Sequence, residues 1–174
     1  PVIVTIIPCR HQMEDTIETL GVSDSTTARV NSDYHLTLLT MSKSDWKSKR
    51  KRILSIVQNT LKAHLSPDSD FVVETIVKLG NFVALSGDRA SNPSFFALHQ
   101  ALRVSLEACR VALYGHMSFI PHISLFRPDY SIDHEEVVLR QIEKRLGRLE
   151  SCRIHVEQVI ISDGTGQDIT VWEC

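Results

Sequence analysis

The stretches His35-Leu36-Thr37-Leu38 and His122-Ile123-Ser124-Leu125 are two copies of one pattern: a histidine, any residue, a small hydroxyl residue and a leucine. Each copy lies in an apolar run that is typical of a β-strand. Because side chains alternate between the two faces of a strand, the histidine and the hydroxyl residue share one face and the aliphatic residues share the other. The sequence therefore predicts two strands that each present an imidazole and a hydroxyl group to a cleft.

Looser versions of the pattern occur at His64-Leu65-Ser66 and His116-Met117-Ser118, and neither has the final leucine. The first runs into Pro67 at an expected helix end, and the second lies just upstream of the second full copy. The alternative interpretation of the two full copies is that their histidines are ordinary strand residues on polar faces.

The length and composition indicate one soluble globular domain covering residues 1–174, built as two intertwined lobes. The chain has 174 residues, of which 43% are hydrophobic and 23% charged, and its net charge is −2. This charge gives no overall attraction to nucleic acid, so any phosphate recognition must be local. No apolar run approaches the length needed to cross a membrane.

The cysteines and the first residues of the chain are relevant to the cellular compartment of the protein. Cys9, Cys109, Cys152 and Cys174 are widely spaced, without a CxxC pair, which favours a reducing compartment over a disulfide framework. We therefore expect a cytoplasmic protein, with the nucleus as an alternative. The run Pro1-Val2-Ile3-Val4 predicts a strand and not a signal peptide, and we expect the chain to be a domain or processed piece of a larger protein.

Hydrophobic periodicity predicts the order β-α-β-α-β-β-α-β-α-β-β, an α+β fold with mostly antiparallel sheets. Ser44 is the expected N-cap of the long second helix, and Asp133 with Glu136 resembles a capping box. Because the two copies of the motif occupy comparable places in this order, we expect two lobes related by a rough two-fold, with a central cleft between them and helices outside. The expected strands are 2–7, 34–40, 71–79, 82–85, 119–126, 152–161 and 169–172, and the expected helices are 10–20, 44–65, a helix opening at 92–93, and 133–147.

The two motifs and this layout resemble the two-histidine (2H) phosphoesterase superfamily. The residues that carry the resemblance lie in 34–39 and 119–126. They are most similar to the nucleotide-binding domain of A-kinase anchoring proteins and to viral 2′,5′-oligoadenylate phosphodiesterases. Bacterial RNA 2′,3′-cyclic phosphodiesterases usually end the first motif with Phe-Leu-Gly, where this chain has Leu39-Thr40-Met41. The resemblance implies a bilobal 2H (LigT-like) fold and a ribonucleotide or oligoribonucleotide substrate.

The paired histidines fit phosphodiester cleavage, which needs a base on the attacking oxygen and an acid on the leaving oxygen. An imidazole titrates near pH 6.5, so His35 and His122 can supply both roles, in an order that the sequence leaves open. The hydroxyls of Thr37 and Ser124 would hold the phosphoryl oxygens. Neither motif offers a third metal ligand at a useful spacing, so we expect no metal and no other cofactor.

Other residues have a functional and a structural interpretation. Arg127 could contact phosphate if a bulge turns it inward, and otherwise is a solvated arginine. Tyr34 and Phe119 could stack on a base, and otherwise pack in the core. A basic cluster surrounds Trp46 and predicts either an RNA-binding or nuclear-import patch or, as the favoured alternative, a solvated helix face; it consists of Lys43, Lys47, Lys49, Arg50, Lys51 and Arg52.

Three functions follow as hypotheses. The first is a metal-independent phosphodiesterase for a 2′-linked ribonucleotide, with 2′,5′-oligoadenylate favoured and a 2′,3′-cyclic phosphate next. The second is a module that binds an AMP-like nucleotide without turnover, within a larger protein. The third is an RNA-binding domain that uses the basic helix. We expect no membrane partner.

Overall fold

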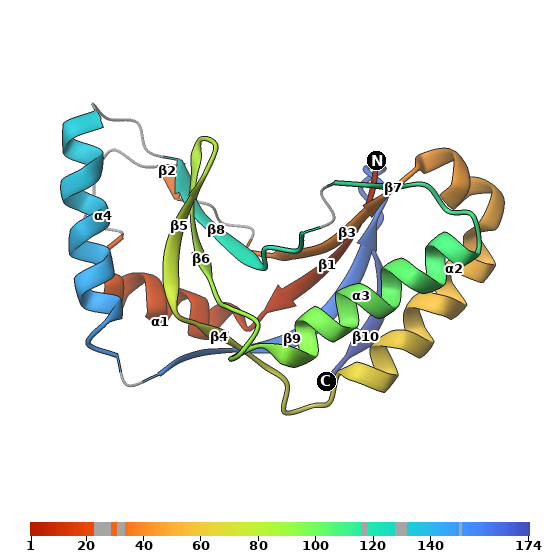
Figure 1. Cartoon of the computed structure of the whole chain (residues 1–174), viewed down its shortest axis with the longest axis horizontal. Coiled ribbons are helices and arrows are strands. Elements are labelled where there is room, and N and C mark those ends of the chain that lie inside the picture. Colours follow the sequence, from red (N-terminus) through yellow and green to blue (C-terminus); the bar gives the residue numbers. More distant parts are fainter. Residues whose placement is uncertain (23–28, 31–33, 116–117, 128–131, 150) are drawn as a thin grey trace.

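The structure is a computed structural model that describes residues 1–22, 29–30, 34–115, 118–127, 132–149 and 151–174, without the side chains of 29–30, 127 and 132–135. Residues 23–28, which belong to the segment between the expected helix 10–20 and the expected strand 34–40, lie outside the described residues, as does His116. Strands and helices follow the chain (Figure 1) in the order β1 Val2–Pro8, α1 Arg10–Leu20, β2 Arg29–Val30, β3 Leu36–Met41, α2 Lys43–His64, β4 Asp70–Val73, β5 Thr75–Leu79, β6 Phe82–Ser86, α3 Pro93–Ala108, β7 Leu113–Tyr114, β8 His122–Arg127, α4 Ile132–Leu146, β9 Cys152–Ser162 and β10 Ile169–Glu173.

The strands form a curled antiparallel sheet in the order β10-β9-β1-β3-β8-β6-β5. Helices α2 and α3 pack together beside β10 and β3, whereas α1 and α4 pack together near β9 and β5 (Figure 1). The two halves are joined where β3 pairs with β8, at Leu36 opposite Ile123. This arrangement confirms the predicted α+β fold with helices on the outside and the two motif strands at the centre.

The core follows the predicted periodicities. In β1 the alternate residues Val2, Val4 and Ile6 are buried, and the α1 residues Met13 and Ile17 are buried at helical spacing. Apolar residues at helical spacing are also buried on α2 at Trp46, Ile53, Val57 and Leu61, on α3 at Phe95, Leu98, Leu102 and Leu106, and on α4 at Val138, Ile142 and Leu146.

The starts of α2 and α4 differ from the prediction. Ser42, and not Ser44, is the N-cap of α2, and its Oγ accepts from the backbone N–H of Asp45 at 3.4 Å. Ser44 lies inside the helix and its hydroxyl is 2.7 Å from that of Ser42. Asp133 of the expected capping box lies within α4, and its side chain is outside the description.

The single strand predicted over 71–79 is two strands, because the chain changes partner at Glu74. Before this residue β4 pairs with β9, and after it β5 pairs with β6. The Glu74 carboxylate accepts from the backbone N–H of Asp88 at 2.8 Å and from the Ser91 hydroxyl. Both motif strands begin later than expected: β3 begins at Leu36, just after Tyr34 and His35, and β8 begins at His122, after Phe119 and Ile120.

Within the described residues, no helix combines the length and the apolar character that crossing a membrane requires. The thiols of Cys9, Cys109, Cys152 and Cys174 are all free.

Candidate active site

Pairing of the two motif strands brings their histidines together. Leu36 and Ile123 are opposite each other and are each 1% exposed, so they fix which face of β3 and β8 enters the core. Their neighbours along each strand must then project from the other face. If this antiparallel register is continued by one residue in each direction, His35 falls opposite Ser124 and Thr37 falls opposite His122.

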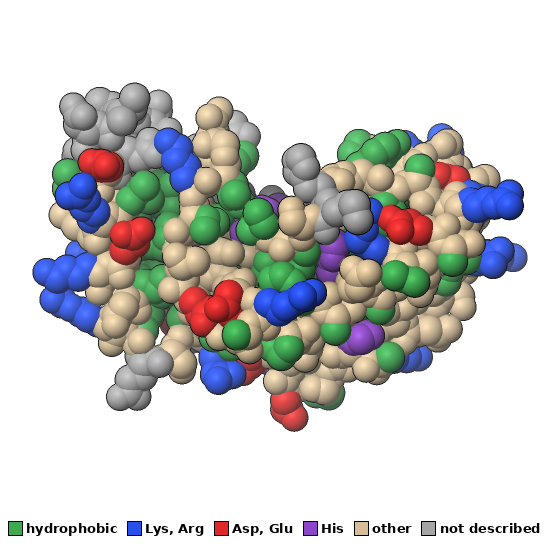
Figure 2. Space-filling view, viewed as in Figure 1, with side chains coloured by type: hydrophobic (Ala, Val, Ile, Leu, Met, Phe, Trp, Pro, Cys, Tyr) green, Lys and Arg blue, Asp and Glu red, His purple; other side chains and the backbone are tan. Residues whose placement is uncertain are grey.

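His35, His122 and Ser124 line one cavity of about 540 Å³. Ser118 adds a further hydroxyl, and the remaining lining residues are the apolar Leu79, Phe82 and Ile120. Figure 2 shows histidine side chains where the surface is hollowed between the two halves of the molecule. The volume lies within the range of about 300–1,000 Å³ that small-molecule sites occupy. The cavity thus combines two acid–base groups with hydroxyls and an apolar wall.

The ring of His122 is held by the backbone beside it. Its Nδ1 is 2.8 Å from the carbonyl oxygen of Ile120, and because a carbonyl can only accept, Nδ1 carries the hydrogen. In the neutral ring, Nε2 is therefore the nitrogen with the lone pair, able to take up a proton. The next carbonyl, that of Pro121, accepts a 2.7 Å hydrogen bond from the buried Ser86 hydroxyl. Both bonds fix the start of β8.

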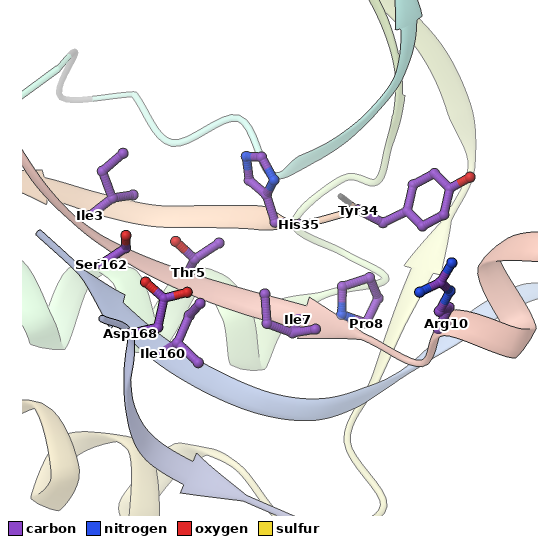
Figure 3. Close-up of a pocket in the computed structure, with 10 residues that line it drawn as sticks. All are labelled: Ile3, Thr5, Ile7, Pro8, Arg10, Tyr34, His35, Ile160, Ser162 and Asp168. Atoms are coloured by element: carbon purple, nitrogen blue, oxygen red, sulfur yellow. The ribbon is translucent and has the colours of Figure 1, made fainter. Parts of the chain in front are cut away.

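His35 also lines a second cavity, of about 480 Å³, which lies over β1 and β9 (Figure 3). Its floor follows β1, where Ile3, Thr5 and Ile7 face the cavity. Tyr34 lies at one end of this row in the view of Figure 3. Burial raises the pKa of the Tyr34 phenol, with a smaller contribution from the charge of Glu14 that Arg10 partly offsets. At neutral pH this phenol is therefore a hydrogen-bond donor.

The other candidate residues are placed differently. Thr37 stands beside Thr5 of β1 and is not among the residues that line either cavity. The ring of Phe119 is stacked on His99 at 4.3 Å and meets Phe96 edge-on at 5.2 Å, so it packs against α3 and not against the cavity. The buried His99 is part of this packing.

Arg127 ends β8 and pairs with Arg29 of β2, and its side chain is outside the description. The strand is irregular just before it, because the register between β8 and β6 shifts between Ser124 and Phe126. Consistent with this bulge, Leu125 and Phe126 are both buried although they are consecutive. This irregularity is of the kind that an inward-facing Arg127 requires.

The basic cluster on α2 is partly engaged in local contacts. Trp46 is buried, and the Arg50 guanidinium lies over its ring at 5.3 Å. The Lys49 ammonium bonds to the Asp45 carboxylate at 2.7 Å and donates to the carbonyl oxygen of Arg110. These contacts support the interpretation of this face as structural and solvated.

Sequence reasoning did not single out Leu79 and Phe82, which reach the cavity because they flank the turn between β5 and β6. A predicted hairpin with apolar residues next to Gly80 was the only available signal. Among the described residues, no group of three His, Cys, Asp or Glu side chains comes together in a way that could hold a metal ion.

Three solved structures are similar to the chain in fold. The chain is similar to the E. coli LigT structure complexed with 3′-AMP, at 16% identity and a TM-score of 0.58 over 97% of this chain and 92% of that one. It is also similar to the MHV ns2 PDE domain, at 17% identity and a TM-score of 0.56 over 76% of this chain and 86% of that one. A structure described as a phosphoesterase matches at 16% identity, a TM-score of 0.56 and coverages of 97% and 92%.

No protein-family model matches the sequence, and no curated protein matches it. The similarity to these solved structures shows the fold, which is that of LigT and of the MHV ns2 PDE domain, and it confirms the LigT-like fold that the paired motifs predicted.

Proposed function

We propose that the chain is a metal-independent phosphodiesterase that cleaves a 2′-linked ribonucleotide phosphodiester, with 2′,5′-oligoadenylate favoured and a 2′,3′-cyclic phosphate next. The observation that carries this proposal is that His35, His122 and Ser124 line a single cavity. The similar folds of a PDE domain and of a LigT structure that holds 3′-AMP support the same reaction class and a nucleotide ligand.

In the proposed reaction one histidine takes the proton from the attacking oxygen, which belongs to water or to the neighbouring ribose hydroxyl. The new P–O bond forms as the bond to the leaving ribose oxygen breaks, and the other histidine gives its proton to that oxygen. The Nδ1 bond of His122 to Ile120 leaves Nε2 for either role. Ser124 would donate to a non-bridging oxygen on which charge builds in the transition state. The same role for Thr37 requires its hydroxyl to reach the cavity from the neighbouring strand, since Thr37 does not line it.

The mixture of apolar and polar residues that line the cavity suits the proposed reaction. Leu79 and Phe82 form an apolar wall on which a base can pack, while the hydroxyl of Ser118 adds a donor. Nothing in the proposed step requires a metal ion, because two imidazoles with different protonation states complete the proton transfers.

The test is product analysis with 2′,5′-linked triadenylate, its 3′,5′-linked isomer and a 2′,3′-cyclic nucleotide, each with and without a chelator. We expect AMP release from the 2′,5′-linked substrate, unaffected by the chelator. Tight binding of the nucleotide without any turnover would indicate a binding module and not an enzyme. RNA binding with steep salt dependence that survives loss of both histidines would favour the basic helix instead.

A further inference from the structure

His35 lies on the boundary between two cavities of comparable size. One, of about 540 Å³, is also lined by His122 of β8, and the other, of about 480 Å³, extends over β1 and β9. In the sheet, β1 and β8 lie on opposite sides of β3. A phosphorus atom held beside His35 therefore has room for a nucleoside-sized group in each direction. This matters for the choice of substrate, because a linear phosphodiester carries a nucleoside on both sides of its phosphate, whereas a 2′,3′-cyclic mononucleotide carries one.

The second cavity has an apolar floor made by neighbouring strands. Thr5 of β1 is paired with Ile160 of β9, and Ile3 is paired with Ser162, so that these side chains stand next to one another. Ile7 continues the row towards Tyr34 (Figure 3). Such a surface can bury the face of a base or a ribose, because apolar contact supplies most of the binding energy in small-molecule sites.

Polar groups stand where they can orient a ligand on this floor. Ser162 and Asp168 lie near Ile3 and Thr5, and Tyr34 lies towards the other end of the row (Figure 3). The Asp168 carboxylate can only accept hydrogen bonds when ionised, and it repels phosphate. It therefore selects a neutral donor, such as a ribose hydroxyl or the amino group of a base, over a further phosphate group.

We propose that this second cavity is the subsite for the second nucleoside of a linear ribonucleotide phosphodiester, with Asp168 and Ser162 as its specificity-determining residues. The proposal rests on the proposed phosphodiesterase function and narrows it to linear substrates. A 2′,3′-cyclic mononucleotide would occupy the His122 side alone and leave the contacts over β1 unmade.

The experiment compares 2′,5′-linked diadenylate with adenosine 2′,3′-cyclic phosphate in the wild type and in three variants. Asp168→Ala removes the acceptor, and Ser162→Phe fills the cavity. Gln167→Ala is the matched control, because Gln167 is exposed, precedes Asp168 and does not line the cavity. Turnover is measured first. The dissociation constants of both ligands are then measured in a His122→Ala background, so that binding is read without cleavage.

We expect Asp168→Ala and Ser162→Phe to weaken diadenylate binding about tenfold or more, the effect of losing a hydrogen bond to a charged group or the space for the ligand. Binding of the cyclic nucleotide should stay within about twofold, and Gln167→Ala should change neither constant by more than that. Equal losses for both ligands, or no loss for either, would overturn the subsite. If the wild type shows no turnover but the binding differences are observed, the phosphodiesterase function is contradicted and the proposed subsite is supported.

Discussion

Ser86 fixes the backbone next to His122: its buried hydroxyl donates a 2.7 Å hydrogen bond to the carbonyl oxygen of Pro121. Ser86 also stands directly opposite His122 in the pairing of β6 with β8. The neighbouring Ile120 carbonyl in turn holds the imidazole through Nδ1. The orientation of the histidine thus depends on two successive carbonyls, of which that of Pro121 is held by Ser86, 35 residues away in the chain.

Ser86→Ala tests this support. Because it leaves the buried Pro121 carbonyl without its donor, we expect the free energy of unfolding to fall by about 1–3 kcal/mol. If the ring of His122 then loses its alignment, kcat should fall by about tenfold to a hundredfold while KM stays near its wild-type value. Urea denaturation and steady-state kinetics measure the two effects. A stability loss with unchanged kcat would show that Ser86 supports the fold and not the histidine.

Ser124→Ala tests the proposed contact with phosphate. Removing a donor that stabilises transition-state charge costs about 10²–10³ in kcat in enzymes that use one, and we expect a loss near the lower end of this range. Ser124→Thr is the control, because it keeps the hydroxyl and lies beside the small Ala84 on β6. A Ser124→Ala enzyme with wild-type kcat would exclude this hydroxyl from the reaction.

The fold could be predicted from the sequence because its main signals are local. Alternation in the two motifs fixed the faces of His35 and His122, since Leu36 and Ile123 had to be buried. The contacts that complete the site are not local. The Ser86–Pro121 bond depends on the pairing of β6 with β8, and Asp168 reaches the second cavity only because of how β10 follows β9. The bulge after Ser124 could not be predicted, because it lies in a run of apolar residues that contains no sequence signal for it.

His99 should make stability depend on pH. Burial, with a smaller effect from the charge of Arg103, lowers the pKa of His99 below its usual 6.5. The unfolded chain therefore binds a proton near pH 6.5 that the folded chain does not, so stability is lost as pH falls below this value and is level above it. The free energy of unfolding should decline less between pH 7.5 and 5.5 in His99→Leu than in the wild type, measured by urea titration. An equal decline of the free energy of unfolding in both proteins would contradict this role of His99.

Asp45 should make a contribution of the same sign at lower pH. The hydrogen bond from Lys49, followed by that from the backbone N–H of Ala112 at 2.9 Å, lowers the pKa of Asp45 below its usual 3.8. Its stabilising effect is present above that value and is lost as pH falls through the lowered pKa. Asp45→Asn should therefore lower Tm at pH 7, and the difference should shrink in acid. The exposed Asp68→Asn serves as the control, and an equal Tm change in both variants would count against the interaction.

The central claim is that the imidazoles of His35 and His122 act on one phosphorus atom, and single-turnover cleavage of a 2′,5′-linked substrate by His35→Ala and His122→Ala tests it most directly. Each variant should lose about 10²–10⁴ in rate, the usual contribution of one general acid or base, while remaining folded. A rate within about twofold of the wild type in either variant would contradict the two-histidine mechanism.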